Sequence, residues 1–467
     1  MHSVKIETLR EEIFALRPQF AKLVQMNGSK TLLEYYSQEF QNLLVPSNTI
    51  LASIESEVIK ILGEKIGKSA SDAVRSQKWI NTADHHGLLH HPYFYTASLA
   101  RSHHVVCRET TATVTLPFGG VSLGNDSFPR GFSFHNSYGT LERFFFKSLK
   151  QRRLPVYALP PMTKEEFVKE VARSASFSLS KKAHGRLASF LNCIKNDIRV
   201  WEQKTYSSQL TVLNSILWNE LFGTSRGDFV YLEIDCVVKD LLLTKHLVQE
   251  TNVYRLLFKS EWRNSFIEFF AGIPGSHTDN SGTHFFWYID YKNETRRRLI
   301  LSNDSLCTEE GDLHIALTPE SIASGLENKT LMPSTALLLI VVHAAESLAC
   351  AGGPSQLLYL EMLMEKWQLL LCIQGGSEEV VIPYTGIWCG DNALFQMENV
   401  YTSVPKLATL IDCLLYEESF QKKADSALQQ HTVMETVEAM VPTLHYMYTK
   451  VHQPIEYIST ISTITIS

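Results

Sequence analysis

The sequence predicts an α/β fold, because short runs rich in apolar and β-branched residues are separated by longer segments with helical periodicity. Apolar residues between positions 9 and 23 recur at spacings of three and four residues, as on the buried face of a helix. By contrast, F-V-Y-L-E-I-D-C-V-V at 229–238 and H-F-F-W-Y-I-D-Y at 284–291 are runs of strand length in which apolar and aromatic residues predominate. Strands that alternate with helices along a chain are typical of α/β proteins.

Local signals place the ends of several elements. Thr163-Lys-Glu-Glu166 is a capping box, and Thr318 before Pro319 is typical of a helix start. In the first half of the chain, we expect helices over 5–77, 92–102, 138–150 and 162–221, a buried strand over 78–82 and extended structure over 105–134. In the second half, we expect strands over 229–238, 284–291 and 297–301 and a helix over 261–270. Further helices should begin at Thr318, Pro333 and Pro354. The final I-S-T-I-S-T-I-T-I-S is an edge strand or has no ordered structure.

The expected elements group into five segments. Residues 1–77 form a helical amino-terminal segment, 78–160 the first part of the α/β core and 161–225 a helical insertion. Residues 226–400 form the second part of the core, and 401–467 a helical carboxyl-terminal segment. A chain of 467 residues is long enough for more than one domain.

Composition limits the function classes. With 45% hydrophobic and 20% charged residues and a net charge of −6, the chain is typical of a globular protein and lacks the basic surplus of a nucleic-acid binder. The most apolar stretch, 336–342, is too short to span a bilayer, and the amino terminus lacks the apolar run of a signal peptide. The eight cysteines contain no C-x-x-C pair. We therefore expect a cytoplasmic protein with a small-molecule substrate and neither nucleic-acid nor membrane partners.

A histidine cluster follows the expected strand at 78–82, where α/β proteins usually place their chemistry. It consists of His85, His86, His90, His91, His103 and His104, with Asp84 beside the first pair. Imidazole binds metals, transfers protons and binds anions near neutral pH. His86 and His90, four residues apart, are the candidate metal ligands, although Gly87 between them weakens a helix. A metal-free ligand loop and buried structural histidines are the alternatives.

Two glycine-containing segments are further candidates. Gly119, Gly120 and Gly124 would let backbone amides approach an anion, to which Arg130 and His135 would add charge; a hairpin without a ligand is the alternative. The pair Gly352-Gly353 precedes an expected helix start, where free amides and the helix dipole favour anions; a break that needs glycine for packing is the alternative. Ser355, Gln356 and Tyr359 could add side-chain contacts there.

Parts of these segments resemble a known family over about residues 50–370. Thr82, Gly87, Leu88 and Pro92 match a loop of the form T-G-Q-Q-x-G-L-x-x-G-P, with Ala83-Asp84-His85 in place of G-Q-Q. Downstream, L-M-P-S-T from Leu331, then Gly353, Pro354, Gln356 and Tyr359, match L-L-P-T-x-A-Y-V-x-G-P-G-E-x-A-Y-W, and F-F-W-Y-I-D-Y-K-N-E-T-R-R-R-L resembles the paired strands before it. The family is that of the bacillithiol-biosynthesis enzyme thought to add cysteine to glucosaminyl-malate. The resemblance implies a Rossmann-like core, a nucleotide-like or sugar-acid ligand, and a homodimer.

We therefore expect an α/β protein with a Rossmann-like core that acts as a ligase-like enzyme, joining an amino compound to a small acidic or sugar-derived substrate. His85 or His86 would act as general base, Asp84 would orient an imidazole or bind the amine, and the amides of Gly353 and Ser355 would hold an anion. The cofactor would be a nucleotide or a divalent metal. The alternatives are a metal-dependent hydrolase or oxygenase and a non-catalytic binding protein. The expected substrate-binding residues are Thr82, Gly87, His90, His91, Arg130, Gly353, Ser355, Gln356 and Tyr359.

Overall fold

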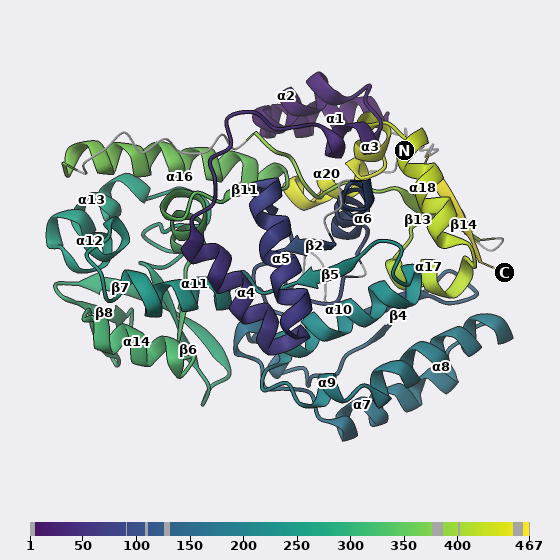
Figure 1. The fold of residues 1–467 in the computed structure, drawn as a ribbon, viewed down its shortest axis with the longest axis horizontal. Helices are drawn as coiled ribbons and strands as arrows, with labels where there is room; N and C mark the ends of the chain where they lie inside the picture. Colours follow the sequence, from purple (N-terminus) through teal and green to yellow (C-terminus); the bar gives the residue numbers. More distant parts are fainter. Residues whose placement is uncertain are drawn as a thin grey trace.

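A four-stranded parallel sheet lies at the centre of the protein (Figure 1). The computed structural model describes residues 5–89, 91–107, 111–125, 131–375, 386–399, 402–451 and 461–466. The strand order is β11-β1-β2-β5, with Ile80 opposite Cys350 and Val114 opposite Val230. The mixed structure with a parallel sheet agrees with the α/β prediction. The strands are β1 Trp79–Asn81, β2 Ala112–Thr115, β5 Asp228–Tyr231 and β11 Ala349–Ala351.

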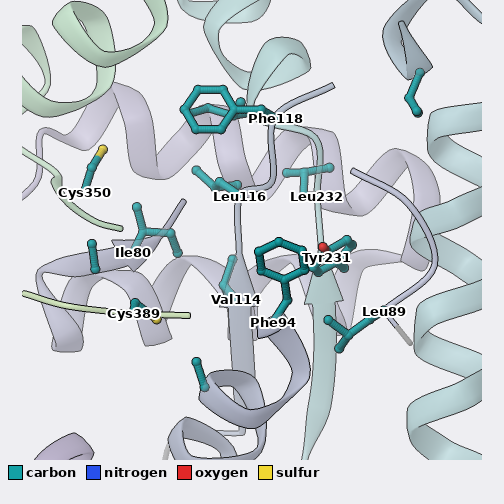
Figure 2. Close-up of a cluster of buried hydrophobic side chains, with 14 of the residues drawn as sticks. Ile80, Leu89, Phe94, Val114, Leu116, Phe118, Tyr231, Leu232, Cys350 and Cys389 are labelled. Carbon is teal, nitrogen blue, oxygen red and sulfur yellow. The ribbon is translucent and has the colours of Figure 1, made fainter. Parts of the chain in front are cut away.

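Apolar side chains on these strands explain why the sheet is buried. Ile80, Val114 and Tyr231 are at most 1% exposed, and Figure 2 shows them packed with Leu116 and Phe94 in one apolar cluster. Parallel strands with both faces covered by helices usually carry such continuous apolar runs. The sheet is therefore the core of the fold rather than a surface ribbon.

The expected amino-terminal helices are confirmed. Helices α4 and α5 pack closely together, and α5 also packs on β2. Gly63, at a φ of 95°, separates them, because this left-handed backbone favours glycine. The helices are α1 Ile6–Leu16, α2 Pro18–Asn27, α3 Leu32–Ser37, α4 Asn48–Leu62 and α5 Glu64–Gln77.

The prediction of a helix over 138–150 is wrong. An antiparallel hairpin of β3 Phe132–His135 and β4 Leu141–Phe144 occupies part of this segment. The side-chain oxygen of Asn136 accepts hydrogen bonds from the amides of Tyr138 and Thr140, which closes a turn instead of continuing a helix.

The helical prediction for 162–221 is confirmed, including the capping box at Thr163. Figure 1 shows α7, α8 and α9 together at one side, whereas α10 packs against β5 and is buried over most of its length. The helices from residue 92 to 270 are α6 Pro92–Cys107, α7 Lys164–Val171, α8 Lys181–Asn196, α9 Ile198–Trp201, α10 Tyr206–Phe222, α11 Ile234–Leu241, α12 Asn252–Phe258 and α13 Ser260–Phe270.

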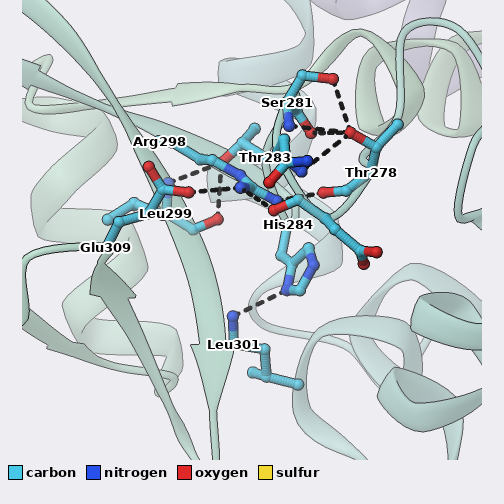
Figure 3. A network of polar contacts seen from close by, with 10 residues as sticks. Thr278, Ser281, Thr283, His284, Arg298, Leu299, Leu301 and Glu309 are labelled. Carbon is cyan, nitrogen blue, oxygen red and sulfur yellow. Dashed lines mark hydrogen bonds and ion pairs between the residues drawn. The ribbon is translucent and has the colours of Figure 1, made fainter.

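A second, antiparallel sheet has the order β10-β6-β7-β8-β9, and its β6–β7 pair confirms the two strands expected around 284–301. Figure 3 shows how the loop before β6 is held on β7. Arg298 donates to the carbonyl oxygen of Asp279 at 2.7 Å, and Nδ1 of His284 accepts from the amide of Leu301 at 2.8 Å. The strands are β6 Phe286–Asp290, β7 Thr295–Ser302, β8 Ser305–Thr308, β9 His314–Ala316 and β10 Leu331–Pro333.

Two boundaries in the second half of the chain differ from expectation. Pro333 ends β10, and the next helix begins at Thr335 with Ser334 as its N-cap; that helix continues as a π-helix, Ile340–Ala345, before β11. The expected strand 229–238 ends at Tyr231, and α11 begins at Ile234. In both places the chain leaves a strand and enters a helix within three residues.

The part of the final run that the structure describes contains an edge strand, which is one of the two alternatives expected for it. β14 pairs parallel with β12 at the edge of a three-stranded sheet. In the described ranges, no helix has both the length and the apolar character needed to cross a membrane. The remaining elements are α14 Pro319–Glu327, α15 Thr335–Leu339, α16 Pro354–Ile373, β12 Phe395–Asn399, β13 Thr402–Leu407, α17 Leu410–Tyr416, α18 Phe420–Gln430, α19 Val433–Glu438, α20 Val441–Thr449 and β14 Ser462–Thr465.

Candidate functional site

The carboxyl ends of the four parallel strands bring the predicted segments to one edge of the sheet. Strand β1 is followed by Thr82 and by the loop that carries His85, His86 and His91, which we call the histidine loop. Strand β2 is followed by the Gly119-Gly120 pair, and β11 by the Gly352-Gly353 pair. Strand β2 lies on one side of β1 and β11 on the other, so the chain changes direction across the sheet at this point. Such switch points are where open α/β sheets usually bind ligands.

Direct contacts join the segments that follow β1 and β11. The amide and the hydroxyl group of Thr82 both donate to the carbonyl oxygen of Ala351, at 2.9 and 3.1 Å. The side-chain amide of Gln356 in turn donates to the Thr82 hydroxyl at 2.5 Å. Thr82 and Gln356 are buried, at 0% and 4% exposure. These two predicted site residues are therefore brought together as a buried link between two strands.

Close packing accounts for both glycines before α16. A Cβ atom on Gly352 would lie 2.4 Å from the side chain of Gln356, and one on Gly353 would lie 2.1 Å from the carboxylate of Asp391. Burial raises the pKa of Asp391 to about 7. Ser355 contacts the Tyr448 hydroxyl at 3.3 Å, and Tyr359 is half-buried. The glycine pair thus has a packing role, and an anion at this helix start stays a prediction.

The histidine loop continues the parallel pairing beyond β1. The Phe118 amide donates to the carbonyl oxygen of Asp84 at 2.9 Å, and the His86 amide donates to that of Phe118 at 2.7 Å. Asp84 and His86 are buried, and His85, which pairs with Phe118, is half-buried. The histidine loop and the Gly119-Gly120 segment are consequently neighbours.

Buried contacts account for much of this loop. The His86 ring lies 5.5 Å from that of Tyr231, and its Nε2 is 3.0 Å from the carbonyl oxygen of Ser207. Asn214 of α10 donates to the carbonyl oxygen of Gly87 at 2.9 Å and accepts from the amide of Leu89 at 2.6 Å. The carbonyl oxygen of His91 accepts from the amides at the start of α6. The loop is held in place by α10, which comes from the expected helical insertion.

Of the two candidate metal ligands, the structure describes His86 but not His90. His90 and Arg130 lie outside the described residues. Within the described ranges, no three His, Cys, Asp or Glu side chains are grouped so that they could hold a metal ion. His135 is held by Asp412, whose carboxylate lies 2.8 Å from its Nδ1. His135 therefore anchors β3 to α17 rather than adding charge to the glycine segment.

A cavity of about 480 Å³ lies beside the Gly119-Gly120 segment. Its walls include the backbone of Gly120 together with the side chains of Arg153 and Arg296. Arg296 donates to the carbonyl oxygen of Gly120 at 2.7 Å and lies 4.1 Å above the Trp287 ring. Arg153 is exposed and has no ion pair with any residue that the structure describes. The remaining lining residues are Val121, Ser122, Asn125, Pro155, Glu294 and Thr295.

Two buried carboxylates that the sequence analysis missed lie behind this segment. Glu233 and Asp235 follow β5 and are 2% and 0% exposed. The amide of Gly119 donates to Oδ2 of Asp235 at 2.7 Å, and a Cβ atom on Gly119 would lie only 1.9 Å from Oε1 of Glu233. The signal in the sequence was L-E-I-D, two acids at the end of an apolar run, which the longer expected strand concealed.

These carboxylates lack partners that buried acids usually have. Within the described residues, Oε1 of Glu233 and Oδ1 of Asp235 accept no hydrogen bond. Burial, followed by the charge of Glu233, raises the pKa of Asp235 to about 8, and burial also raises the pKa of Glu233. Lys329 opposes both shifts by its positive charge. Asp235 therefore holds a proton near neutral pH, and a cationic group bound beside the two acids would favour its charged form.

Comparisons with known proteins do not assign the site. No family model matches the chain, and a search of curated proteins found no match. The family resemblance described above therefore stays a prediction.

Replacement of Asn214 by alanine should lower the free energy of unfolding by about 2–4 kcal/mol, because it leaves a buried carbonyl and a buried amide of the histidine loop without their partner. Asn219, exposed on the same helix, is the matched control, and its replacement should change stability by less than about 0.5 kcal/mol. Urea unfolding curves measure both values. Equal small effects would show that Asn214 does not hold the loop.

The raised pKa of Asp235 predicts the pH dependence of stability. The folded protein holds the Asp235 proton up to about pH 8, whereas an unfolded aspartate, with a pKa near 3.8, releases it. The contribution of this bound proton to the unfolding free energy is therefore full below pH 3.8 and is lost as pH rises to about 8. Asp235→Asn should flatten the fall in unfolding free energy between pH 5 and 8, and Asp240→Asn on the same helix should not. A slope unchanged by Asp235→Asn would contradict the assignment.

Proposed function

We propose that the protein is a ligase-like enzyme that joins an amino compound to a small acidic or sugar-derived substrate at the carboxyl edge of the parallel sheet. The Gly120 cavity, with Arg153 and Arg296 in its wall, is the observation that carries this proposal. Its volume of about 480 Å³ falls in the range of small-molecule sites, roughly 300–1,000 Å³. Guanidinium groups pair with carboxylates or phosphates through two parallel hydrogen bonds, so the acidic part of the substrate would bind there.

The second group of the substrate is an amine near Gly119. An ammonium group is a cation that would satisfy the unpartnered oxygens of Glu233 and Asp235. An amine must lose a proton before it attacks. Asp235 holds its own proton up to about pH 8 in the free protein, and an ammonium group bound beside it would favour its carboxylate form, which can then accept the proton of the amine. The two acids contact Gly119, and the next residue lines the cavity, so the amine and the acid of one molecule could bind on either side of this segment.

The reaction needs an activated partner. A nucleoside triphosphate would supply the activation, in line with the nucleotide that the resemblance implies. A carboxylate oxygen of the acid partner would first take a phosphoryl or nucleotidyl group from the nucleoside triphosphate, which releases the nucleoside diphosphate or diphosphate. The amine nitrogen would then form a bond to the carboxyl carbon as that oxygen leaves with its phosphoryl or nucleotidyl group, and the amine proton would pass to the carboxylate of Asp235. A Rossmann-like core is part of this proposal, because ligands of such folds bind at a strand-order switch like that beside β1.

Calorimetric titration with malate tests the acid site. The wild-type protein should bind malate, and Arg153→Gln should weaken the affinity about 10- to 100-fold, since one charge-assisted hydrogen bond contributes about 1.5–3 kcal/mol. Arg75→Gln, at an exposed arginine on α5, is the control and should bind like the wild type. Equal affinities in all three proteins would place the acid elsewhere.

Turnover is tested with glucosaminyl-malate, which carries an amine and an acid, together with cysteine and a nucleoside triphosphate. Mass spectrometry should detect the condensed product, and Asp235→Asn should lower its rate at least tenfold while malate still binds. Malate binding without product in the wild type would favour the alternative of a non-catalytic binding protein.

A further inference from the structure

A second cavity, of about 210 Å³, lies at the opposite, amino edge of the parallel sheet. Trp79, the first residue of β1, lines it, whereas the site described above follows the last residue of that strand. The cavity is enclosed by the end of α3, the end of α5 and Arg101 of α6. At roughly 30 Å³ per water molecule it has room for about seven waters, which suits a small ion or a short organic acid.

Arg101 is a buried cation that has no carboxylate partner among the described residues. Its side chain lines the cavity in a residue that is 1% exposed. One guanidinium nitrogen donates to Oε1 of Gln77 at 2.9 Å, another contacts the Thr115 hydroxyl at 3.4 Å, and the group lies 4.6 Å from the Trp79 ring. Its Nε has no hydrogen-bond partner in the described part of the chain. Buried charges are almost always paired, so this guanidinium lacks the anion that such a group requires.

The other lining residues favour an anion. Lys78, half-buried at the end of α5, has no ion pair with a described residue. The Tyr36 hydroxyl, also in the wall, has no oxygen or nitrogen partner among those residues and can donate. The one carboxylate in the lining is that of Glu39, which is exposed. The two cations therefore outnumber the acid.

We propose that this cavity binds a small anion, a carboxylate or a phosphate, whose oxygens pair with the Arg101 guanidinium. Gln77 positions the guanidinium from one side, and the Trp79 ring covers its face. The Tyr36 hydroxyl and the Lys78 ammonium group complete the donor set. Phe40, whose ring lies 5.6 Å from that of Trp79, provides an apolar wall for the carbon part of an organic acid. The proposal is independent of the function at the carboxyl edge, since the two cavities share no residue.

Gln77→Glu tests the proposal without removing the buried cation. Its carboxylate would stand where the Gln77 oxygen accepts from Arg101, so it would supply the missing anion within the chain. We expect the ligand-free variant to melt at a higher temperature than the wild type. We also expect calorimetric titrations with inorganic phosphate and with acetate, at constant ionic strength, to show at least a tenfold loss of affinity in the variant. The anion that binds the wild type more tightly identifies the preferred headgroup.

Two further variants control for the added charge and for the other cavity, and a third tests a second residue of the proposed site. Gln429→Glu makes the same change at an exposed position of α18 and should bind like the wild type. Arg153→Gln alters only the Gly120 cavity and should leave this affinity unchanged. Lys78→Gln should weaken binding several-fold. Absence of phosphate and acetate binding to the wild type, or equal affinities in the wild type and Gln77→Glu, would overturn the proposal.

Discussion

Backbone pairing that continues past the ends of four short parallel strands is the constraint on which the rest of the structure depends. The strands have only three or four residues each. Beyond them, the amides of Thr82, Leu116 and Leu232 donate to the neighbouring strand at 2.9–3.0 Å. A buried amide that loses its partner is costly, so the segments that leave the sheet cannot drift from its edge. Residues far apart in the sequence are thereby held in fixed register.

Close packing at the carboxyl edge distinguishes buried residues that fix the loops from residues that line the cavity. Gly119 and Gly352 are glycines because Glu233 and Gln356 occupy the space that a side chain would need. Thr82, Gln356 and the His86 imidazole are buried and set the positions of the loops. The groups that can contact a ligand, Arg153 and Arg296, lie in the wall of the Gly120 cavity. The buried residues of the loops thus position the residues that line the cavity.

The opposite edge carries a different imbalance of charge. Among the described residues, two buried acids at the carboxyl edge lack donors for one oxygen each, whereas a buried guanidinium at the amino edge lacks a carboxylate. Acidic and basic groups are thus left incompletely partnered near the two ends of β1. Low dielectric surroundings strengthen the attraction of each for an oppositely charged ligand.

The sequence predicted elements whose signals are local, and it failed where distant contacts decide. Capping at Thr163 and Thr318 and the apolar run of β1 were sufficient for those elements. β11 was missed because A-C-A is too short to show a period, and the strand at 229–238 was extended over a turn because apolar residues continue beyond Glu233 and Asp235.

The candidate site was predicted only in part, for a similar reason. The three predicted segments do meet at the carboxyl edge, but Ser207 and Tyr231, which bury His86, lie more than 120 residues further along the chain. No pattern around the histidines could reveal those neighbours. Glu233 and Asp235 were missed because their role depends on contact with Gly119.

Hydrogen–deuterium exchange with and without malate tests the central claim most directly, because it reports where on the chain a small acidic ligand binds. If the carboxyl edge is the site, peptides that contain Gly120–Asn125, Arg153 and Arg296 should gain protection together, while the exposed helix α8 exchanges as before. Protection confined to other parts of the protein, under conditions in which malate is bound, would contradict the account.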